Sequence, residues 1–313
     1  MSGSDANGTR GSGPDATADG ERATRLPTAR ELVDAATEVL AAAGVSSPRH
    51  DALALAAHAF GVPRLELVMP PPVTADVVAA MAEAVRRRRA REPLQHILGR
   101  TTFRWVTLRV VPGVFVPRPE TEVVAGAAIE EAQRLAAAGG TPLVVDLCTG
   151  SGAIAAAVAQ ETPARVVAVD ASPEAVELTR ENTAGLGAHP VRVEAGDVRD
   201  PALLGDLDGA VDVVVSNPPY IPPDAVPLEV EVRDHDPDLA LYGGGPDGLS
   251  LPRAVVEAAA RLLRPGGLLV MEHADVQGAG TRALAEAEGR FTDVATERDL
   301  TGRDRYLRAR RAR

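Results

Sequence analysis

The tetrapeptide Asn217-Pro218-Pro219-Tyr220 is the stretch of this 313-residue chain whose residue types point most directly to chemistry. It follows the run 211–216, whose apolar character predicts a buried strand. The side-chain oxygen of Asn217 and the carbonyl of Pro218 are two acceptors on a backbone that the proline rings make rigid. Tyr220 adds an aromatic face on which a planar group can stack. The stretch therefore predicts a clamp for the two N–H bonds of a planar –NH2 group.

The clamp suits the transfer of a methyl group to a delocalised nitrogen. An amide nitrogen is a poor nucleophile because its lone pair is shared with the neighbouring carbonyl group. Holding both N–H bonds favours pyramidalisation and frees the lone pair toward a methyl donor, with no general base needed before attack. A hydride-transfer enzyme has no use for this arrangement. The competing interpretation is a plain turn after a strand, and the rest of the chain decides between the two.

The turn after an earlier apolar run, 143–147, is rich in glycine and suits a nucleotide-containing ligand. Gly150 and Gly152 let a ligand approach the backbone, and the helix that follows offers free N–H groups. With Ala155 they satisfy the G-x-G-x-x-A dinucleotide pattern, which is weak evidence without its context. Asp170 ends the next strand pattern, where a carboxylate can accept hydrogen bonds from ribose hydroxyls.

Asp197 follows Gly196 at a third strand end and is placed to reach an adenine amine. These three strand ends fit any adenosine-containing ligand, so they do not choose between NAD and S-adenosylmethionine. The clamp at the fourth strand end does choose, because only a methyl acceptor requires it. The four motifs together therefore predict a methyltransferase site.

An alternation of strand and helix patterns after residue 123 positions these motifs. The strand patterns lie at 143–147, 165–170, 191–195, 211–216, 268–272, 293–298 and 305–310. Helical patterns separate most of them, which predicts an α/β fold with a mostly parallel, doubly wound sheet. Ligands of such sheets bind outside the carboxyl ends of the strands, where all four motifs lie.

The chain ahead of the sheet divides into three predicted parts. Residues 1–26 are rich in Gly, Ser, Ala and Asp and predict a disordered tail. Residues 27–91 predict a small helical domain, and residues 92–117 predict a linker that contains a β-hairpin. Residues 118–313 then form the methyltransferase domain.

The helical domain carries clear start signals. Thr28 and Glu31 form a capping box for the first helix, and Pro48 begins the second. A third helix is predicted from near Thr74 to the basic run 86–89. We interpret that run as solvated charge at a helix end rather than a nucleic-acid site.

The composition and charge of the chain limit the classes of partner that we expect. The net charge is −11, the pI is about 5.1, and all 33 basic residues are arginines, which argues against a phosphate backbone as the main partner. The single cysteine excludes an intrachain disulfide. Residues 1–22 lack the apolar core of a secretory signal, and no apolar run is long enough for a membrane span. We expect a cytoplasmic monomer without a membrane or direct nucleic-acid partner.

The motifs resemble those of class I S-adenosylmethionine-dependent methyltransferases that modify planar amino groups. More closely, residues 27–313 resemble the HemK-type (PrmC) release-factor glutamine methyltransferases. The stretches that carry this resemblance are 92–97 with Gly99, Phe115–Glu122, 231–233 with Pro237 and 240–241, 244–249, and 264–267 with Glu272, His273 and Gln277. The resemblance implies a Rossmann-like, seven-stranded, mostly parallel sheet and a small N-terminal helical domain joined to it by a β-hairpin.

The resemblance also implies the reaction, which moves a methyl group from S-adenosyl-L-methionine to the side-chain amide N5 of a glutamine. That glutamine lies in the Gly-Gly-Gln motif of class I peptide chain release factors, and the helical domain resembles the family's release-factor docking domain. Carried over by position, the donor site comprises Asp146, Cys148, Thr149, Gly150, Ser151, Gly152, Asp170, Asp197, Val198 and Asn217. The catalytic and substrate site comprises Asn217, Pro218, Pro219 and Tyr220, enclosed by Phe115, Arg118 and Glu122, and no metal is expected.

Three positions depart from the family pattern. Cys148 stands where the family usually has glycine, and we interpret it as a small loop residue rather than a catalytic thiol. Asp236 replaces the usual Glu before Pro237, which keeps the charge. Residues 103–105, Phe-Arg-Trp, replace a more usual aromatic-Gly end, which bears on the shape of the hairpin.

Several alternatives remain open. The substrate could be a glutamine in a ribosomal protein, or an adenine amine that is flipped out of a nucleic acid, although the acidic charge disfavours the latter. A non-catalytic S-adenosylmethionine-binding scaffold would not need the clamp, and an NAD oxidoreductase would make the clamp a coincidence. The acidic segment 229–238 is either a lid or a solvated loop, and His273 is placed for a minor role near the cleft.

Overall fold

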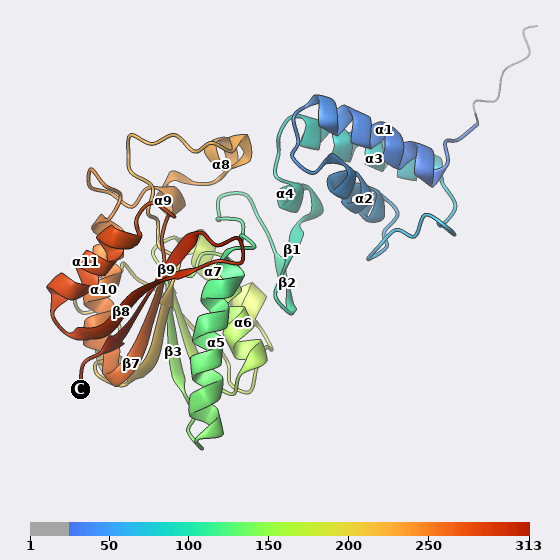
Figure 1. The fold of residues 1–313 in the computed structure, drawn as a ribbon. Helices are drawn as coiled ribbons and strands as arrows, with labels where there is room; N and C mark the ends of the chain where they lie inside the picture. The colour runs from blue at the N-terminus through green and yellow to red at the C-terminus, as the bar shows by residue number, and fades with distance from the viewer. Residues whose placement is uncertain (1–24) are drawn as a thin grey trace, which may run out of the picture.

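The computed structural model describes residues 25–313 and divides them into a helical part and a larger sheet part (Figure 1). The helical part, in blue, joins the sheet part through a short hairpin. Residues 1–24 of the predicted tail lie outside the described residues, so the prediction of a disordered tail stays untested. The domain boundaries at residues 91 and 117 likewise stay predictions.

Three helices make up the helical part: α1 Ala29–Ala42, α2 Pro48–Ala59 and α3 Ala75–Arg89. The predicted capping box is confirmed, because the Glu31 N–H donates to Thr28 Oγ1 at 3.2 Å and the Thr28 N–H donates to the Glu31 carboxylate at 2.6 Å. These two bonds satisfy N–H groups that the first turn leaves free. The helices bury a common apolar core that includes Val33, Leu40, Leu55, Ala56 and Met81.

Arg88 corrects the interpretation of the run 86–89 as solvated charge. Its side chain is buried, and its Nε donates to Asp51 Oδ2 at 2.8 Å. A buried guanidinium needs such partners because desolvation without them is costly. The sequence pattern could not separate Arg88 from its neighbours, since four consecutive arginines carry no periodicity.

The linker contains one helix that the sequence did not reveal, α4 Leu94–Leu98, and then the predicted hairpin. The hairpin pairs β1 Arg100–Phe103 with β2 Val106–Arg109 in antiparallel register, with Phe103 opposite Val106. Its turn takes Arg104 to φ 50°, a left-handed conformation that favours glycine. Residues 103–105, which replace the family's usual aromatic-Gly end, therefore include a residue in a strained backbone conformation, Arg104.

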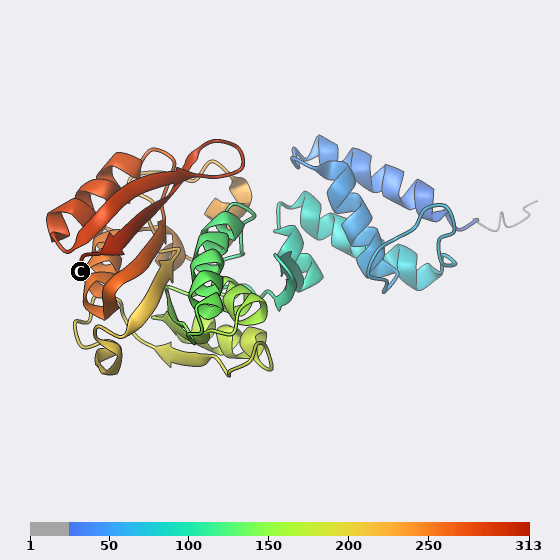
Figure 2. The ribbon, with the colours of Figure 1, turned by 60° about the horizontal axis from the view of Figure 1, so that its bottom comes forward.

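The sheet has seven strands in the order β5-β4-β3-β6-β7-β9-β8 (Figure 2). Their bounds are β3 Leu143–Leu147, β4 Arg165–Asp170, β5 Arg192–Ala195, β6 Val211–Ser216, β7 Leu263–Glu272, β8 Phe291–Arg298 and β9 Asp304–Arg311. The first five in this order are parallel, and β9 runs antiparallel to both of its neighbours. The predicted seven-stranded, mostly parallel sheet is confirmed. The largest difference in strand bounds is at β7, which begins at Leu263 instead of residue 268, and β8 begins at Phe291 instead of residue 293.

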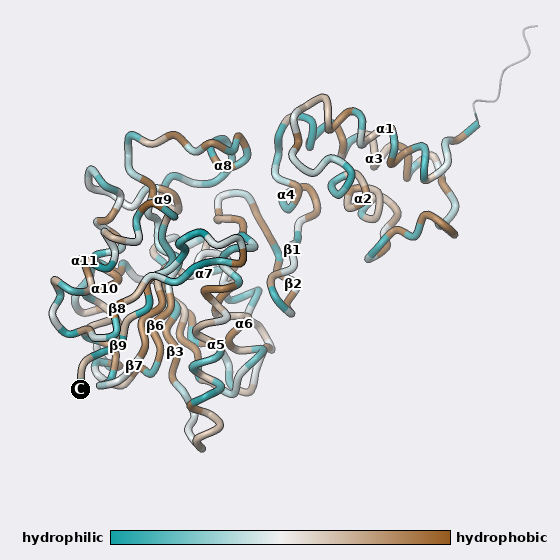
Figure 3. Tube along the Cα trace, viewed as in Figure 1, coloured by the Kyte–Doolittle hydropathy of each residue, from teal (hydrophilic) through white to brown (hydrophobic). Residues whose placement is uncertain are grey.

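Helices cover both faces of this sheet (Figures 1 and 2). They are α5 Thr121–Ala137, α6 Ala153–Glu161, α7 Pro173–Thr183, α10 Ser250–Leu262 and α11 Gly278–Glu288. Alternate strand residues divide between the faces: Val144 packs with α5 and α6, and Val145 packs with α10 and α11. Burial on both faces explains why the strands are continuous apolar runs, seen as the brown core strands of Figure 3.

The remaining short elements lie mainly around the carboxyl ends of the strands. They are the 3-10 turn η1 Gly205–Leu207, α8 Val230–His235 and α9 Asp238–Leu241. Both α8 and α9 lie beyond the strand ends, at the top of Figure 1. Within residues 25–313, no helix has the length and apolar content required to cross a bilayer.

Candidate active site

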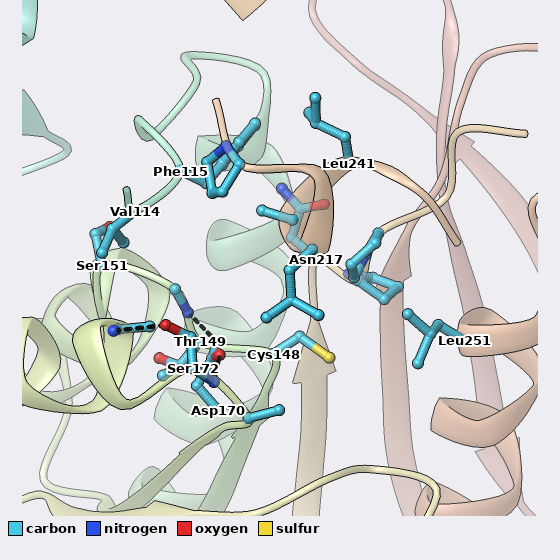
Figure 4. A pocket seen from close by; sticks show the side chains of 18 of the residues that line it. Val114, Phe115, Cys148, Thr149, Ser151, Asp170, Ser172, Asn217, Leu241 and Leu251 are labelled. Atoms are coloured by element: carbon cyan, nitrogen blue, oxygen red, sulfur yellow. Dashed lines mark hydrogen bonds between the residues drawn. The ribbon is translucent and has the colours of Figure 1, made fainter. Parts of the chain in front are cut away.

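A cavity of about 420 Å³ lies at the carboxyl ends of the central strands (Figure 4). Its walls are the loop after β3, the ends of β4 and β5, the residues after β6, and the segment 113–121 that leads into α5. Residues of α8 and α9 also line it. The place is the one expected for a ligand of a doubly wound sheet, and the volume suits a small molecule.

The loop after β3 is held in shape by a buried carboxylate. Asp146 is fully buried, and its Oδ2 accepts hydrogen bonds from Thr149 Oγ1 at 2.6 Å and from the Ala155 N–H at 3.1 Å. Burial raises the pKa of Asp146 to about 7. Asp146 does not line the cavity, so it acts by fixing Thr149, which does. Gly150 takes φ 58° and has open space where a Cβ would stand, so its backbone faces the cavity.

Cys148 occupies a left-handed backbone position in the same loop. Its φ is 59°, which explains why the family pattern favours glycine here. Burial, followed by the nearby carboxylates of Asp170 and Asp146, raises the pKa of the Cys148 thiol well above its usual range. The residue is therefore a neutral thiol that lines the cavity and packs against the apolar core.

Two carboxylates, Asp170 at the end of β4 and Asp197 after β5, differ in the groups that already bind them. Asp170 accepts the Gly150 N–H at 2.8 Å and the Ser172 N–H at 2.9 Å, so it joins two loops that line the cavity. Burial raises the pKa of Asp170, and the hydrogen bonds from the Ser172 and Gly150 N–H groups lower it by a smaller amount. Asp197 instead accepts from both the backbone and the guanidinium of Arg199, with Nη2 at 2.5 Å. That ion pair is exposed, so the Asp197 carboxylate already has a cationic partner at the rim of the cavity.

The residues after β6 present the predicted clamp to the cavity. Asn217 Nδ2 donates to Thr121 Oγ1 at 3.3 Å, and within residues 25–313 no donor binds the side-chain oxygen Oδ1, which remains an acceptor for a ligand. Ser216, the last strand residue, is anchored by its hydroxyl to the Leu147 carbonyl at 2.7 Å. Asn217, Pro218, Pro219 and Tyr220 all line the cavity. Figure 4 shows Asn217 above Cys148, so the clamp and the glycine-rich loop open into one space.

Distant segments hold the clamp's backbone in place. Gln277 Nε2 donates to the Tyr220 carbonyl at 2.8 Å and to the Asp247 carbonyl at 3.0 Å. Gly248 packs so closely that an added Cβ would lie 2.3 Å from the Tyr220 oxygen, and at Gly243 it would lie 2.6 Å from the Pro219 oxygen. Close approach to the clamp therefore requires glycine at positions 243 and 248 of the Gly-Gly-Gly-Pro-Asp-Gly segment.

The segment ahead of α5 contributes an aromatic ring and a cation. The Arg118 guanidinium lies 5.1 Å from the centre of the Phe115 ring, and its Nη2 donates to Asp236 Oδ2 at 2.6 Å. Burial raises the pKa of Asp236, opposed by the charge of Arg118. Glu122 faces elsewhere: its carboxylate accepts the Arg104 N–H at 3.1 Å and does not line the cavity.

The acidic segment after the clamp is tied to the helical part, which rules out the solvated-loop interpretation for Glu231. Glu231 Oε1 lies 2.8 Å from Arg88 Nη1, and Glu231 Oε2 lies 2.6 Å from Arg91 Nη2. Burial acts to raise the pKa of Glu231, but hydrogen bonds from Arg91 and Arg88 hold it at about 2. Its neighbour Val232 lines the cavity, so one side of α8 faces the site while Glu231 binds the helical part.

A buried pair of ionisable residues lies at the end of β7, where Glu272 is the last strand residue and His273 follows it. Glu272 and His273 are almost completely buried and do not line the cavity. The His273 ring interacts through Nδ1 with the Ala274 carbonyl at 2.8 Å, and burial lowers the pKa of His273. Burial raises the pKa of Glu272 to about 7.

The cavity brings together most of the residues expected from sequence. Its lining includes Phe115, Arg118, Cys148, Thr149, Gly150, Ser151, Asp170, Asp197, Val198 and the four clamp residues. Asp146, Gly152 and Glu122 lie behind the lining. Sequence reasoning assigned no role to Thr121, Val232, Leu239, Leu241 and Leu251, which also line it. The apolar residues within the acidic segment 229–241 were the available signal for a cavity wall.

The cavity fits the donor that the resemblance implies. The exposed backbone at Gly150 can face a charged amino-acid group, Asp170 has lone pairs beyond its two backbone bonds, and Val198 offers an apolar surface. The sheet order, the glycine-rich turn and the strand-end cavity define the class I methyltransferase fold.

Comparison with known proteins agrees with this class. Residues 31–99 match the profile of the PrmC N-terminal domain, and residues 142–303 match that of a methyltransferase domain. Release factor glutamine methyltransferases of Mycolicibacterium smegmatis and Streptomyces coelicolor are 50% and 51% identical to this chain. These alignments cover 92% and 88% of this chain, and 98% and 96% of the relatives. The chain belongs to the release factor glutamine methyltransferase family.

Another relative is named for a different acceptor. The 4-amino-L-phenylalanine/4-methylamino-L-phenylalanine methyltransferase of Streptomyces pristinaespiralis is 41% identical, over 86% of this chain and 91% of the relative. A relative that aligns with most of this chain is therefore named for a different substrate.

Proposed function

We propose that this chain transfers a methyl group from S-adenosyl-L-methionine to the side-chain amide N5 of the glutamine in the Gly-Gly-Gln motif of class I peptide chain release factors. One observation carries the proposal: the Asn217–Tyr220 clamp and the glycine-rich loop after β3 open into the same cavity. The family's name supports a glutamine of a release factor as the acceptor.

The clamp residues hold the acceptor amide. Asn217 Oδ1 and the Pro218 carbonyl each accept one N–H of the glutamine –NH2, while the Tyr220 ring covers its plane. Two fixed acceptors bias the nitrogen toward the pyramidal geometry of attack before the reaction begins. The half-buried thiol of Cys148 stays neutral and takes no part in proton transfer.

The other side of the cavity holds the donor. S-adenosylmethionine supplies an electrophilic methyl group when it is bound. The loop 149–152 lies against its amino-acid part, Asp170 accepts its ribose hydroxyls, and Asp197 with Val198 lies at its adenine. Phe115 and Arg118 enclose the cavity beside this donor site, with Arg118 fixed by Asp236.

Glutamine methylation of a ribosomal protein is the alternative with the same chemistry, and methylation of a small aromatic amine is a further one. The clamp binds any planar –NH2, so it does not separate these acceptors. The helical part supports a protein acceptor, because it is tied through Glu231 to the segment over the cavity. Adenine in a nucleic acid is disfavoured by the net charge of −11.

The test is methyl transfer from labelled S-adenosylmethionine to a purified class I release factor. A release factor whose Gly-Gly-Gln glutamine is replaced by alanine is the matched control, and peptide mass spectrometry locates the methyl group. We expect label on the first protein alone. Parallel reactions contain ribosomal proteins, 4-amino-L-phenylalanine and adenine-containing nucleic acid, and label on one of these instead would overturn the proposal.

A further inference from the structure

Glu272 is a buried carboxyl group next to the clamp for which the mechanism above has no role. Parallel pairing sets Ser216 of β6 opposite Met271 of β7, so the next residues along the chain, Asn217 just after β6 and Glu272 at the end of β7, lie side by side. Glu272 is 1% exposed, and its Oε2 has no hydrogen-bond partner among residues 25–313. Burying a carboxylate oxygen without a partner is costly, so Glu272 calls for a structural or functional reason.

The groups that face Glu272 come from every element around it. Burial raises the pKa of Glu272 to about 7, while hydrogen bonding with Thr121 and Tyr220 and the charge of Arg305 favour its ionised form. Glu120 opposes ionisation. Arg305 is itself held by Asp299 at 3.0 Å and does not neutralise Glu272 alone. Thr121 and Tyr220 line the cavity, so Glu272 stands directly behind the site.

These contacts set the direction of a hydrogen-bond chain. An ionised carboxylate only accepts, so a hydroxyl beside it must donate to it. When the Thr121 hydroxyl donates toward Glu272, its lone pairs remain to accept the Asn217 Nδ2–H, which lies 3.3 Å away. Asn217 is then held with Oδ1 in the cavity. If the amide turned over, Asn217 would present N–H groups to the N–H groups of the substrate.

We propose that Glu272 is a positioning residue that acts through Thr121 to keep the acceptor oxygen of Asn217 directed at the substrate amide. This inference rests on the proposed function and adds a residue behind the clamp. The inference also assigns the protonation state that supports turnover. Ionised Glu272 sets the hydrogen-bond chain in the direction that leaves Asn217 Oδ1 in the cavity, whereas protonated Glu272 can donate to Thr121 and reverse that direction. Turnover therefore rises as pH increases through about 7, where Glu272 ionises.

The test uses three variants of the full chain, Glu272→Gln, Thr121→Val and Thr121→Ser. Glutamine can donate as well as accept, and valine keeps the shape of threonine without the hydroxyl. We expect Glu272→Gln and Thr121→Val to lower kcat by about tenfold with donor Kd and Tm unchanged, the size of one hydrogen bond, and Thr121→Ser to restore it. Thr183→Val, a buried threonine outside the cavity, is the matched control.

A pH profile separates positioning from a structural role. In the wild-type chain kcat should rise through about pH 7, and Glu272→Gln should lose that step although Asp146, with a pKa also about 7, is retained. The proposal is overturned if the Glu272→Gln variant has the same kcat and the same pH profile as the wild-type chain. If Glu272→Gln does not fold, equal kcat in Thr121→Val and Thr121→Ser overturns it.

A spectroscopic measurement keeps this test separate from the proposed function. The ¹⁵N-labelled side-chain amide of Asn217, assigned by its loss in Asn217→Ala, should shift with pH near 7 in the wild-type chain and not in Glu272→Gln. Absence of methyl transfer by the wild-type chain would show that the proposed function fails, whatever the amide does. A wild-type Asn217 amide that does not respond to pH would show that the hydrogen-bond chain fails.

Discussion

The polar residues in and behind the cavity differ in whether their acceptor atoms are already hydrogen-bonded. Asp197 is paired with Arg199, and Asp146 is buried behind the loop it supports. Asn217 has its nitrogen bound to Thr121, and its oxygen has no donor among the described residues. The free groups thus coincide with the place where a substrate amide would enter, which residue type alone could not establish.

Cys148 offers a prediction at the residue scale, because it is a non-glycine residue at φ 59°. Cys148→Gly relieves a left-handed strain of roughly 1–2 kcal/mol, offset by greater chain entropy and the lost thiol contact. We expect the free energy of unfolding to change by less than about 1 kcal/mol, with unchanged donor affinity.

Cys148→Ala is the control for that change, because alanine keeps the strain and loses the thiol packing. It should be less stable than Cys148→Gly in urea unfolding. Strain at this position would be excluded if the alanine variant were the more stable of the two.

At the scale of elements, the segment 243–248 packs against the backbone of the clamp and holds it in place. Gly248→Ala would place a Cβ 2.3 Å from the Tyr220 oxygen, so the clamp backbone must move. A displacement of about 1 Å in a positioning group lowers turnover by up to about 100-fold, so we predict a fall in kcat of roughly 10–100-fold. Steady-state methyl transfer measures it.

Gly289→Ala is the matched control for this prediction. Gly289 has φ +81°, close to the +75° of Gly248, but nothing lies within 4 Å of its absent Cβ. Both variants should lose stability through backbone strain, and only Gly248→Ala should lose turnover. Equal kcat in the two variants would mean that contact with Tyr220 does not matter.

The strands were predictable from sequence because both faces of the sheet are buried. Runs such as 143–147 and 211–216 are mainly apolar, and their ends match β3 and β6. The predicted start of β7 was late because Arg-Pro-Gly-Gly lacks strand character, and α4 was missed because five residues hold too little periodicity.

The candidate site was predictable only in part, for a related reason. Motifs that follow strands could be placed together because parallel strands end at one edge. Contacts between distant segments, such as Gln277 with Tyr220 or Glu231 with Arg88, leave no local pattern in the sequence. The roles of the residues behind the clamp therefore required the three-dimensional arrangement.

At the scale of the whole molecule, a buried ionic cluster joins the helical part to the segment over the cavity. Arg88 binds both Asp51 within the helical part and Glu231 in α8, and Arg91 binds the other oxygen of Glu231. The position of α8 therefore depends on the helical part. A protein substrate that contacts the helical part would meet a cavity wall already held in place.

Glu231→Gln tests this connection. Removing the charge of Glu231 leaves the buried Arg88 with the Asp51 carboxylate and the Glu92 carbonyl, and breaking a buried pair costs about 3 kcal/mol, so Tm should fall measurably. We also expect a higher KM for the release factor with unchanged donor affinity. Glu83→Gln, which removes an exposed partner of Arg86, is the control and should change Tm little.

The same cluster predicts a pH dependence. The pKa of Glu231 is about 2 in the folded chain, below its unfolded value of about 4.3. Its stabilising contribution is thus complete above the unfolded pKa and is lost as pH falls toward 2. Thermal unfolding should show a smaller loss of stability between these pH values in Glu231→Gln, and an identical loss would contradict the assignment.

The most direct test of the central claim compares Asn217→Ala with Asp170→Ala in donor titration and in single-turnover methyl transfer to the release factor. If the clamp binds the acceptor amide, Asn217→Ala should reduce the rate of transfer by about 100-fold or more while donor Kd stays near wild type. Asp170→Ala should instead raise donor Kd by about tenfold or more. Equal loss of donor affinity in both variants would contradict the account, because Asn217 would then belong to the donor site rather than to a clamp for the substrate.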